Sequence, residues 1–211
     1  MWSSLGSAVH ETDVVSFFVD QKCFSNLSPL DILRHNAYHL SNVLAKLTLV
    51  QHANDRIELI AQEVIPDLFI YGLQFSNAYG CDPAELYGRS VGRSVAEVRS
   101  LSELRTLQMQ LDDELFRAGS ESGIMQRVAS ERFELAPLIM TLIRIADKAD
   151  HGVELPQKEF AEEAVPRFMI SSMRLSAVYE VDMDQAVSVR LRQIRDKYGD
   201  VRLLLNQEVP T

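Results

Sequence analysis

The residues whose spacing most directly suggests chemistry are two histidines, His35 and His39, which lie four positions apart. In a helix this spacing places both imidazoles on one face, and imidazoles are common ligands of transition metals. The same spacing is equally typical of polar residues that line a seam between two helices. The stretch RLRQIRDK, residues 190–197, leaves a similar choice. Its cations could bind phosphate, or they could form a solvent-exposed helix face.

The composition indicates a globular protein that can bury a sizeable core. The 211 residues are 46% hydrophobic and 24% charged, and the net charge is −9. Such an acidic balance argues against binding a nucleic-acid polymer, because that requires a basic surface that displaces counterions. It leaves room for a nucleotide, since a small phosphate site needs only a few local cations or a metal ion.

The ends of the chain and its cysteines suggest a location. The opening residues, MWSSLGSAVHETD, have neither the basic nor the apolar region of a signal peptide. No apolar run approaches the length of a membrane span. The two cysteines, Cys23 and Cys81, are too far apart for a CxxC motif and are expected to be reduced thiols. We therefore expect a soluble, cytoplasmic protein without membrane contacts.

Apolar residues recur every three or four positions, which predicts an all-α helical bundle. Strand signals such as Asn-Gly turns and period-two alternation are scarce. One predicted apolar stripe contains Leu33, Ala37, Leu40, Val43, Leu44 and Leu47. The other contains Phe133, Leu135, Leu138, Ile139, Leu142 and Ile145.

Helix-ending residues divide the chain further. Ser28 precedes Pro29 as a predicted N-cap, and Gly80 is a natural left-handed C-cap. Pro66 and Pro166 are expected to kink their helices or to mark a first turn. The predicted helices cover about 29–52, 58–79, from 83 onward, the middle of 94–123, 124–147, 158–179 and 182–198.

Two stretches one hundred residues apart resemble each other. EVIPDLFIYGLQFSNAYGCD (63–82) and EAVPRFMISSMRLSAVYEVD (163–182) are identical at six positions. Unrelated sequences of ordinary composition would match at roughly one or two. We interpret the pair as an internal duplication. The organisation we expect is an N-terminal segment (1–28), a first unit (29–95), a helical connection (96–123), a second unit (124–200) and a tail (201–211).

The repeated unit resembles the MazG-like all-α nucleoside triphosphate pyrophosphohydrolases. Those proteins carry EExxE on one helix and ExxD on the next, followed by a turn and a helix that bears Lys, Asn and a terminal basic-Tyr pair. The resemblance implies carboxylates that bind Mg²⁺ or Mn²⁺ and activate water. It also implies cleavage of a (d)NTP to (d)NMP and pyrophosphate. Since such proteins are usually oligomeric, it further allows a homodimer, or a pseudo-dimer within one chain.

Neither unit carries the complete family motif. In the first unit HNAYH occupies the EExxE position and supplies His35 and His39. Asp67 matches the acid of ExxD, but Val64 stands where the other acid is expected and Glu63 lies one residue earlier. The register implies a site of two histidines and two carboxylates, suited to Zn²⁺, Mn²⁺ or Fe²⁺.

The second unit departs from the motif differently. SERFE places Glu131 and Glu134 at two of the acid positions, although a solvated helix face would explain both equally well. On the next helix Ala164 and Arg167 replace the two acids, with Glu163 one residue away. Arg167 would bring positive charge to the place where the metal belongs. By register, the phosphate contacts are Arg89, Arg93, Arg190, Lys197 and Tyr198.

The sequence thus supports two functions. The first is a nucleotide pyrophosphohydrolase, with Glu63 and Asp67 as catalytic carboxylates and with Glu131, Glu134, His35 and His39 as further metal ligands. In that case acids from one unit would complete a site with bases from the other. The second is a degenerate MazG-like scaffold without a metal, which binds a nucleotide or a protein partner and does not hydrolyse it. The incomplete motifs favour the second, and a purely structural bundle remains a third alternative.

Overall fold

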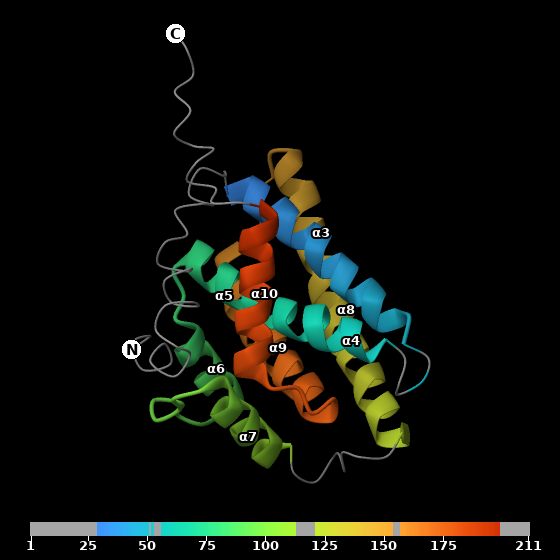
Figure 1. Ribbon diagram of the computed structural model, residues 1–211. Helices are drawn as coiled ribbons and strands as arrows, with labels where there is room; N and C mark the ends of the chain where they lie inside the picture. The colour runs from blue at the N-terminus through green and yellow to red at the C-terminus, as the bar shows by residue number, and fades with distance from the viewer. Residues whose placement is uncertain (1–28, 51, 53–55, 113–120, 154–156, 199–211) are drawn as a thin grey trace.

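The computed structural model describes residues 29–50, 52, 56–112, 121–153 and 157–198, and the regular structure within these ranges is helical. The prediction of an all-α helical bundle is therefore confirmed (Figure 1). The predicted terminal segments and the predicted cap Ser28 lie outside the described residues. The first half contains α3 (Pro29–Thr48), α4 (Ile57–Leu59), the π-helical turn η2 (Ile60–Val64), α5 (Ile65–Tyr79) and α6 (Pro83–Val91).

The second half repeats this order after a connecting helix. The connecting helix is α7 (Leu101–Leu111), and the second half contains α8 (Glu121–Asp150), α9 (Gln157–Val178) and α10 (Met183–Tyr198). The predicted helix in the middle of 94–123 is α7. Within the described ranges, no helix is both long and apolar enough to cross a bilayer.

Side-chain caps fix where the connecting helices begin. The Asp82 carboxylate accepts hydrogen bonds from the amides of Ala84 (2.9 Å) and Glu85 (3.1 Å) at the start of α6. The Ser100 hydroxyl accepts one from the Glu103 amide (3.0 Å) at the start of α7. These bonds satisfy amides that have no partner inside the helix.

The turn that follows the central helix is the same in both halves. Gly80 has φ 64° and Glu180 has φ 53°, so both adopt the left-handed conformation. In each case the next amide returns to a serine carbonyl, from Cys81 to Ser76 (2.9 Å) and from Val181 to Ser176 (2.8 Å). This is a Schellman-type C-cap. The local geometry thus repeats at the spacing of the sequence repeat, even where glycine is replaced by glutamate.

The helices pack as two interlocked halves. The central helices α5 and α9 pack against each other, and α3 packs against α8. The last helix of each half crosses to the other half, because α6 packs on α9 and α10 packs on α5. Two copies related by an approximate two-fold axis would show this pattern. The packing supports the interpretation of an internal duplication.

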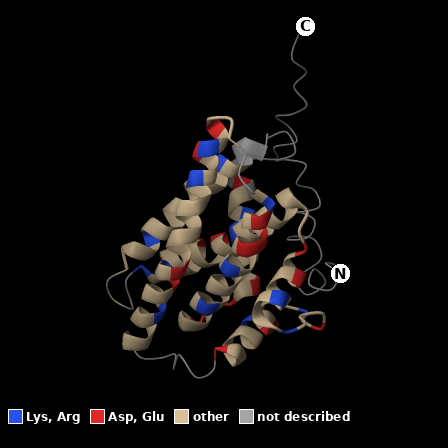
Figure 2. Ribbon diagram, turned by 180° about the vertical axis from the view of Figure 1, so that it is seen from behind, with Lys and Arg blue, Asp and Glu red and all other residues tan. Residues whose placement is uncertain are grey.

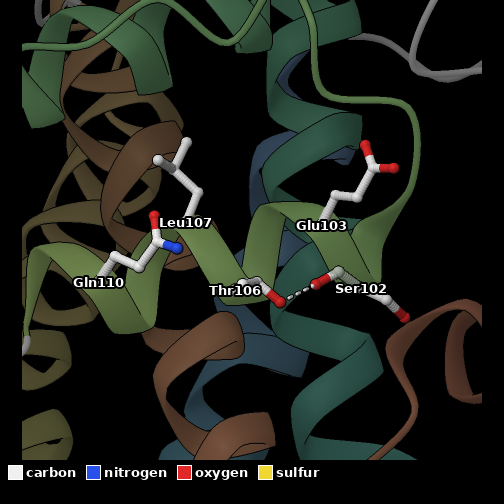
Figure 3. Close-up of a pocket in the computed structure, with 5 residues that line it drawn as sticks. All are labelled: Ser102, Glu103, Thr106, Leu107 and Gln110. Carbon is white, nitrogen blue, oxygen red and sulfur yellow. Dashed lines mark hydrogen bonds between the residues drawn. The ribbon is translucent and has the colours of Figure 1, made fainter.

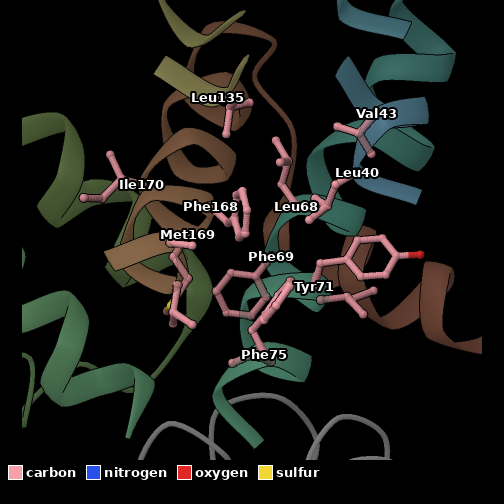
Figure 4. Close-up of a cluster of buried hydrophobic side chains, with 14 of the residues drawn as sticks. Leu40, Val43, Leu68, Phe69, Tyr71, Phe75, Leu135, Phe168, Met169 and Ile170 are labelled. Carbon is pink, nitrogen blue, oxygen red and sulfur yellow. The ribbon is translucent and has the colours of Figure 1, made fainter. Parts of the chain in front are cut away.

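Both halves contribute to one hydrophobic core. Phe75 on α5 lies 6.1 Å, centroid to centroid, from Phe160 and from Phe168 on α9. Figure 4 shows Phe75 and Phe168 in one cluster with Leu40 and Val43 of α3 and Leu135 of α8. Met169, Met173 and Met183 are buried, as expected of core side chains.

One core prediction is wrong. Phe133 was assigned to the buried stripe of α8, yet its exposed fraction is 81%. The inward face of this helix is formed by Leu135, Leu138, Ile139 and Leu142. Position 133 lies two residues, about 200° of helical turn, from Leu135, so its side chain points away from the core.

The central helices approach closely at Gly72 and Ser172, which are equivalent positions of the repeat. A Cβ atom at Gly72 would lie 3.3 Å from Met169 Cγ and 3.5 Å from the Val165 carbonyl oxygen. On the other helix, the Ser172 hydroxyl donates a hydrogen bond to the Ile65 carbonyl (2.7 Å). Small residues therefore permit the close crossing of α5 and α9.

The halves differ just before this crossing. In the first half the backbone hydrogen bonds of the helix change from α to π spacing at η2, where the Ile65 amide donates to the Ile60 carbonyl. Pro66, which has no amide to donate, follows at the first turn of α5, as predicted. In the second half Pro166 lies inside the continuous helix α9.

Candidate functional site

The predicted site residues of the first half lie where α3, η2, α5 and α10 meet. Asp67 is 5% exposed, and its two carboxylate oxygens accept hydrogen bonds from Arg190 Nε (2.7 Å) and Nη2 (2.9 Å). Burial raises the pKa of Asp67, and the Arg190 guanidinium partly offsets that shift. Arg190 belongs to the other half of the chain. A base from one half thus completes the surroundings of an acid from the other.

Glu63 is also paired with a base. Its carboxylate forms an ion pair with Lys46 on α3, at a side-chain exposure of 35% for Glu63 and 15% for Lys46. Lys46 also acts electrostatically on Asp67. The two carboxylates predicted to be catalytic are therefore each neutralised by a cation from a neighbouring helix. We refer to these four residues, together with His35, His39 and Tyr71, as the first cluster.

The two histidines of the first cluster lie beside each other, as their spacing predicted. Their ring centroids are 4.3 Å apart, and the His39 ring stacks on Tyr71 of α5 at 5.7 Å. Burial and the neighbouring His39 lower the pKa of His35 to about 4. His35 is therefore neutral at physiological pH. An uncharged imidazole of this kind keeps a lone pair that can accept a hydrogen bond.

The predicted set of two histidines and two carboxylates does not come together as a metal site. Among the described residues, no group of three or more His, Cys, Asp or Glu side chains is arranged to hold an ion. The positions nearest to the acids are occupied by the cations Lys46 and Arg190.

A second cluster surrounds Glu131 on α8 and is more deeply buried. Glu131 has no exposed surface, and it accepts hydrogen bonds from Arg127 (3.2 Å) and from the Ser171 hydroxyl (2.7 Å). Arg174 lies 3.7 Å from the same carboxylate and binds Asp112 through Nε (2.9 Å) and Nη2 (2.6 Å). The cluster thus links α7, α8 and α9 through two acids and two bases.

Glu134 takes no part in this buried network. It pairs with Arg167 at 3.2 Å, with both side chains about half exposed. Arg167 stands at the repeat position of Asp67, so the charge at this position is reversed between the halves. Arg167 was expected to bring positive charge to the place where the metal belongs, and its guanidinium lies on Glu134, one of the acids predicted to bind that metal.

Asn36 occupies the register position of Glu131 in the first half. Its exposed fraction is 0%, and neither its amide nitrogen nor its amide oxygen has a hydrogen-bond partner within the described part of the chain. The cations that serve Glu131 are missing at the equivalent places, where Ile32 and Gln74 replace Arg127 and Arg174. The same buried position therefore holds a charged, ion-paired residue in one half and a neutral residue in the other.

The remaining predicted phosphate contacts lie away from the acids or cannot be placed. Arg89 is exposed and pairs with Glu85 of its own helix (3.1 Å). The placement of Arg93 on the third helix is wrong, because α6 ends at Val91 and Gly92 follows in the left-handed conformation. Lys197 and Tyr198 lie at the end of α10, and their side chains are outside the described part.

Sequence reasoning missed the cations that complete both clusters. Arg127 could have been found, because it precedes Glu131 by four residues, the spacing of a helical ion pair. Lys46 follows His39 by seven residues and so lies on the same helix face. Arg174 and Asp112 come from separate helices, and no local pattern connects them.

A shallow groove along α7 is separate from these contacts (Figure 3). It has a volume of about 370 Å³ and is lined by Ser102, Glu103, Thr106, Leu107 and Gln110. The Glu103 carboxylate accepts a hydrogen bond from the Arg99 amide (2.6 Å), so it helps to cap the helix. The groove gathers no set of acids and bases that could act on a substrate.

No family model, curated protein or solved structure matches the chain. The family resemblance therefore depends on the motif register and the internal repeat. The geometry itself shows five acids, Glu63, Asp67, Asp112, Glu131 and Glu134, matched by five bases, Lys46, Arg127, Arg167, Arg174 and Arg190. What this arrangement does chemically is to hold helices together.

Proposed function

We propose that this protein is a degenerate MazG-like scaffold, which acts by binding a protein partner and does not hydrolyse nucleotides. One observation carries the proposal. Each of the four carboxylates at or next to a motif position, Glu63, Asp67, Glu131 and Glu134, forms an ion pair with Lys or Arg.

The ion pairs oppose metal binding for a simple electrostatic reason. A bidentate guanidinium, such as Arg190 on Asp67, uses the same carboxylate oxygens that a divalent cation would need. Inserting Mg²⁺ or Mn²⁺ would place two positive groups within a few ångströms of each other. It would also leave a partly buried arginine without its partner, which typically costs several kcal/mol.

The surface supports the protein-binding part of the proposal. Several large apolar side chains are exposed on the outer helices, among them Tyr38 (72%), Phe133 (81%) and Met140 (61%). Single exposed apolar residues are common on protein surfaces, but contiguous apolar patches are typical of surfaces that bind another protein. Phe133 and Met140 both lie on α8, seven residues and so about two helical turns apart, on the same face of that helix.

The test is an assay of the purified chain with a panel of (d)NTPs and either Mg²⁺ or Mn²⁺. We expect no release of pyrophosphate above the protein-free control. The variant Asp67→Asn should instead lower the free energy of unfolding, by about 2–3 kcal/mol, because it leaves Arg190 unpaired.

Glu85→Gln is the matched control for that variant. It removes the acid of the exposed Glu85–Arg89 pair and should change stability by less than about 1 kcal/mol. Pyrophosphate release that disappears in Asp67→Asn would overturn the proposal, since it would assign Asp67 to catalysis.

A further inference from the structure

Two exposed aromatic side chains occupy equivalent positions in the two halves. Tyr38 and Phe133 are 72% and 81% exposed. They lie 95 residues apart, the same offset that relates HNAYH to SERFE. In both motifs the aromatic residue directly precedes the last residue and points outward. A bulky apolar group on the outside of both α3 and α8 is not explained by the core.

Each aromatic begins a stripe along its helix. One line of exposed residues contains Tyr38, Asn42 and Ala45 on α3 and Leu49 directly after it. The corresponding line on α8 contains Phe133, Pro137, Met140 and Arg144, and both helices have other exposed positions beside these lines. The two sets follow the same spacing and the same offset of 95. Arg144 is the one charged residue among the eight. The stripes are therefore equivalent faces of repeated helices.

The two helices run antiparallel, side by side. Arg34 near the start of α3 forms an ion pair with Asp150 at the end of α8. Counting eleven residues inward from this ion pair along two antiparallel helices places Ala45 at about the level of Ile139 and Met140. The offset of the repeat relates Ala45 to Met140. The approximate two-fold axis therefore passes near this pair, with Tyr38 and Phe133 toward opposite ends of the face.

Charge is scarce along this face. Residues 35–45 of α3 and 135–143 of α8 contain no Lys, Arg, Asp or Glu, although the chain as a whole is 24% charged. Accordingly, α8 is drawn mostly in tan along its middle in Figure 2. Depletion of charge together with Tyr, Phe, Met and Arg is the composition of interface cores.

The exposed apolar area supplies a large part of what a dimer requires. Aromatic side chains bury about 150–250 Å² each when covered. With their exposed fractions, Tyr38 and Phe133 alone expose roughly 230–380 Å², and Leu49, Met140 and Ile143 add further apolar area. A standard interface buries about 800 Å² on each partner. The two aromatic side chains alone thus supply roughly a third to a half of that area.

We propose that a second copy of this chain docks on this face, so that two α3 and two α8 helices form the interface. The proposal rests on the proposed scaffold function, since it names the partner. A face with its own approximate two-fold axis presents the same pattern in both directions, which suits an isologous contact. Two chains of net charge −9 repel each other, and none of the eight residues of the two stripes is acidic.

The experiment is light scattering coupled to size-exclusion chromatography of the full chain. The wild-type protein should have twice the chain mass of 23.9 kDa. The double variant Tyr38→Glu/Phe133→Glu should elute at the mass of one chain. Both side chains are exposed, so far-ultraviolet circular dichroism should stay close to that of the wild type. The melting temperature should fall only by the contribution of dimerisation and should no longer depend on protein concentration.

A matched control and a cross-linking arm complete the test. Met109→Glu changes an apolar residue on α7, 43% exposed, and should leave the dimer intact. In a Cys23→Ser/Cys81→Ser background, Met140→Cys should form an intermolecular disulfide on mild oxidation, whereas Met109→Cys should not.

Two results would overturn the inference: a wild-type chain that is monomeric at about 100 µM, or a double variant that remains dimeric. Neither result depends on whether pyrophosphate is released, so the proposed dimer and the proposed absence of hydrolysis are tested separately. A monomer that binds another protein through Phe133 would keep the scaffold and reject the second copy.

Discussion

The first cluster, around Asp67, and the second, around Glu131, stand at corresponding places in the two halves, but they differ in burial and in what they connect. In the first, Asp67 on α5 pairs with Arg190 on α10, so the contact joins the two halves. In the second, Glu131 is completely buried and pairs with Arg127 of its own helix. The first therefore contributes to the association of the halves, whereas the second stabilises one half together with α7.

The difference shows how a buried position determines its neighbours. Where the repeat carries Glu131, a serine and two arginines surround it, because a buried carboxylate without donors is strongly unfavourable. Where the repeat carries the neutral Asn36, the equivalent places hold Tyr71 and Gln74. The difference in charge at this one position is thus accompanied by differences at two positions of the neighbouring central helix. Such coupled differences are what two diverging copies of one unit would accumulate.

The largest effect is expected for Glu131→Gln, which removes the buried charge and leaves Arg127 unpaired. We expect the free energy of unfolding to fall by about 3–5 kcal/mol in chemical denaturation. Glu134→Gln is the control three residues along the same helix. Its ion pair with Arg167 is about half exposed, so the loss should be below about 1 kcal/mol. Equal losses in the two variants would mean that the second cluster is not the sealed network described above.

The next effect concerns pH and separates the first cluster from the second. The pKa of His35 is about 4 in the folded protein, below its ordinary value of 6.5. The folded state therefore disfavours protonation of His35. The contribution of this residue to the free energy of unfolding is fully present above pH 6.5 and declines as the pH falls toward 4. The decline attributable to His35 should be about 1–2 kcal/mol, because solvent screening reduces the full value of about 3 kcal/mol.

The measurement is the unfolding free energy of the wild type and of His35→Gln between pH 4 and 7. The variant should show a flatter dependence over this window. His151→Gln provides the control, since His151 is highly exposed, and it should follow the wild-type curve. A pKa of His35 near 6.5 in an NMR titration would contradict the buried first cluster.

The sequence predicted the helices well and the site only in part, for reasons visible in particular residues. Helix periodicity and the cap at Gly80 depend on neighbours a few positions away, so a single sequence contains them. The acids Glu63, Asp67 and Glu131 were instead assigned from the register of the family motif that the repeated unit resembles. Their roles depend on Lys46, Arg190 and Arg174, which approach from other helices. The prediction that Phe133 is buried was wrong for a related reason, because hydrophobicity alone does not say which face of a helix is covered by other helices.

The smallest effect tests whether the halves are related by symmetry at their closest approach. Ser172 donates a hydrogen bond to the Ile65 carbonyl, and Gly72 faces the equivalent Val165 carbonyl without a side chain. Ser172→Ala should cost about 0.5–1 kcal/mol, the usual net value of such a hydrogen bond.

The sharper comparison is between Gly72→Ser and Gly72→Ala, measured by thermal and chemical unfolding. Both add a Cβ atom 3.3 Å from Met169 Cγ, at the flexible part of that side chain, and both remove the flexibility of glycine. Serine is the poorer helix former by up to about 0.5 kcal/mol, so without a new hydrogen bond the alanine variant should be the more stable. If an approximate two-fold axis relates the crossings, a serine hydroxyl at position 72 reaches Val165 as Ser172 reaches Ile65. Gly72→Ser should then be at least as stable as Gly72→Ala. A serine variant that is weaker by the full helix-propensity difference would show that the two central helices are alike in sequence but do not cross symmetrically.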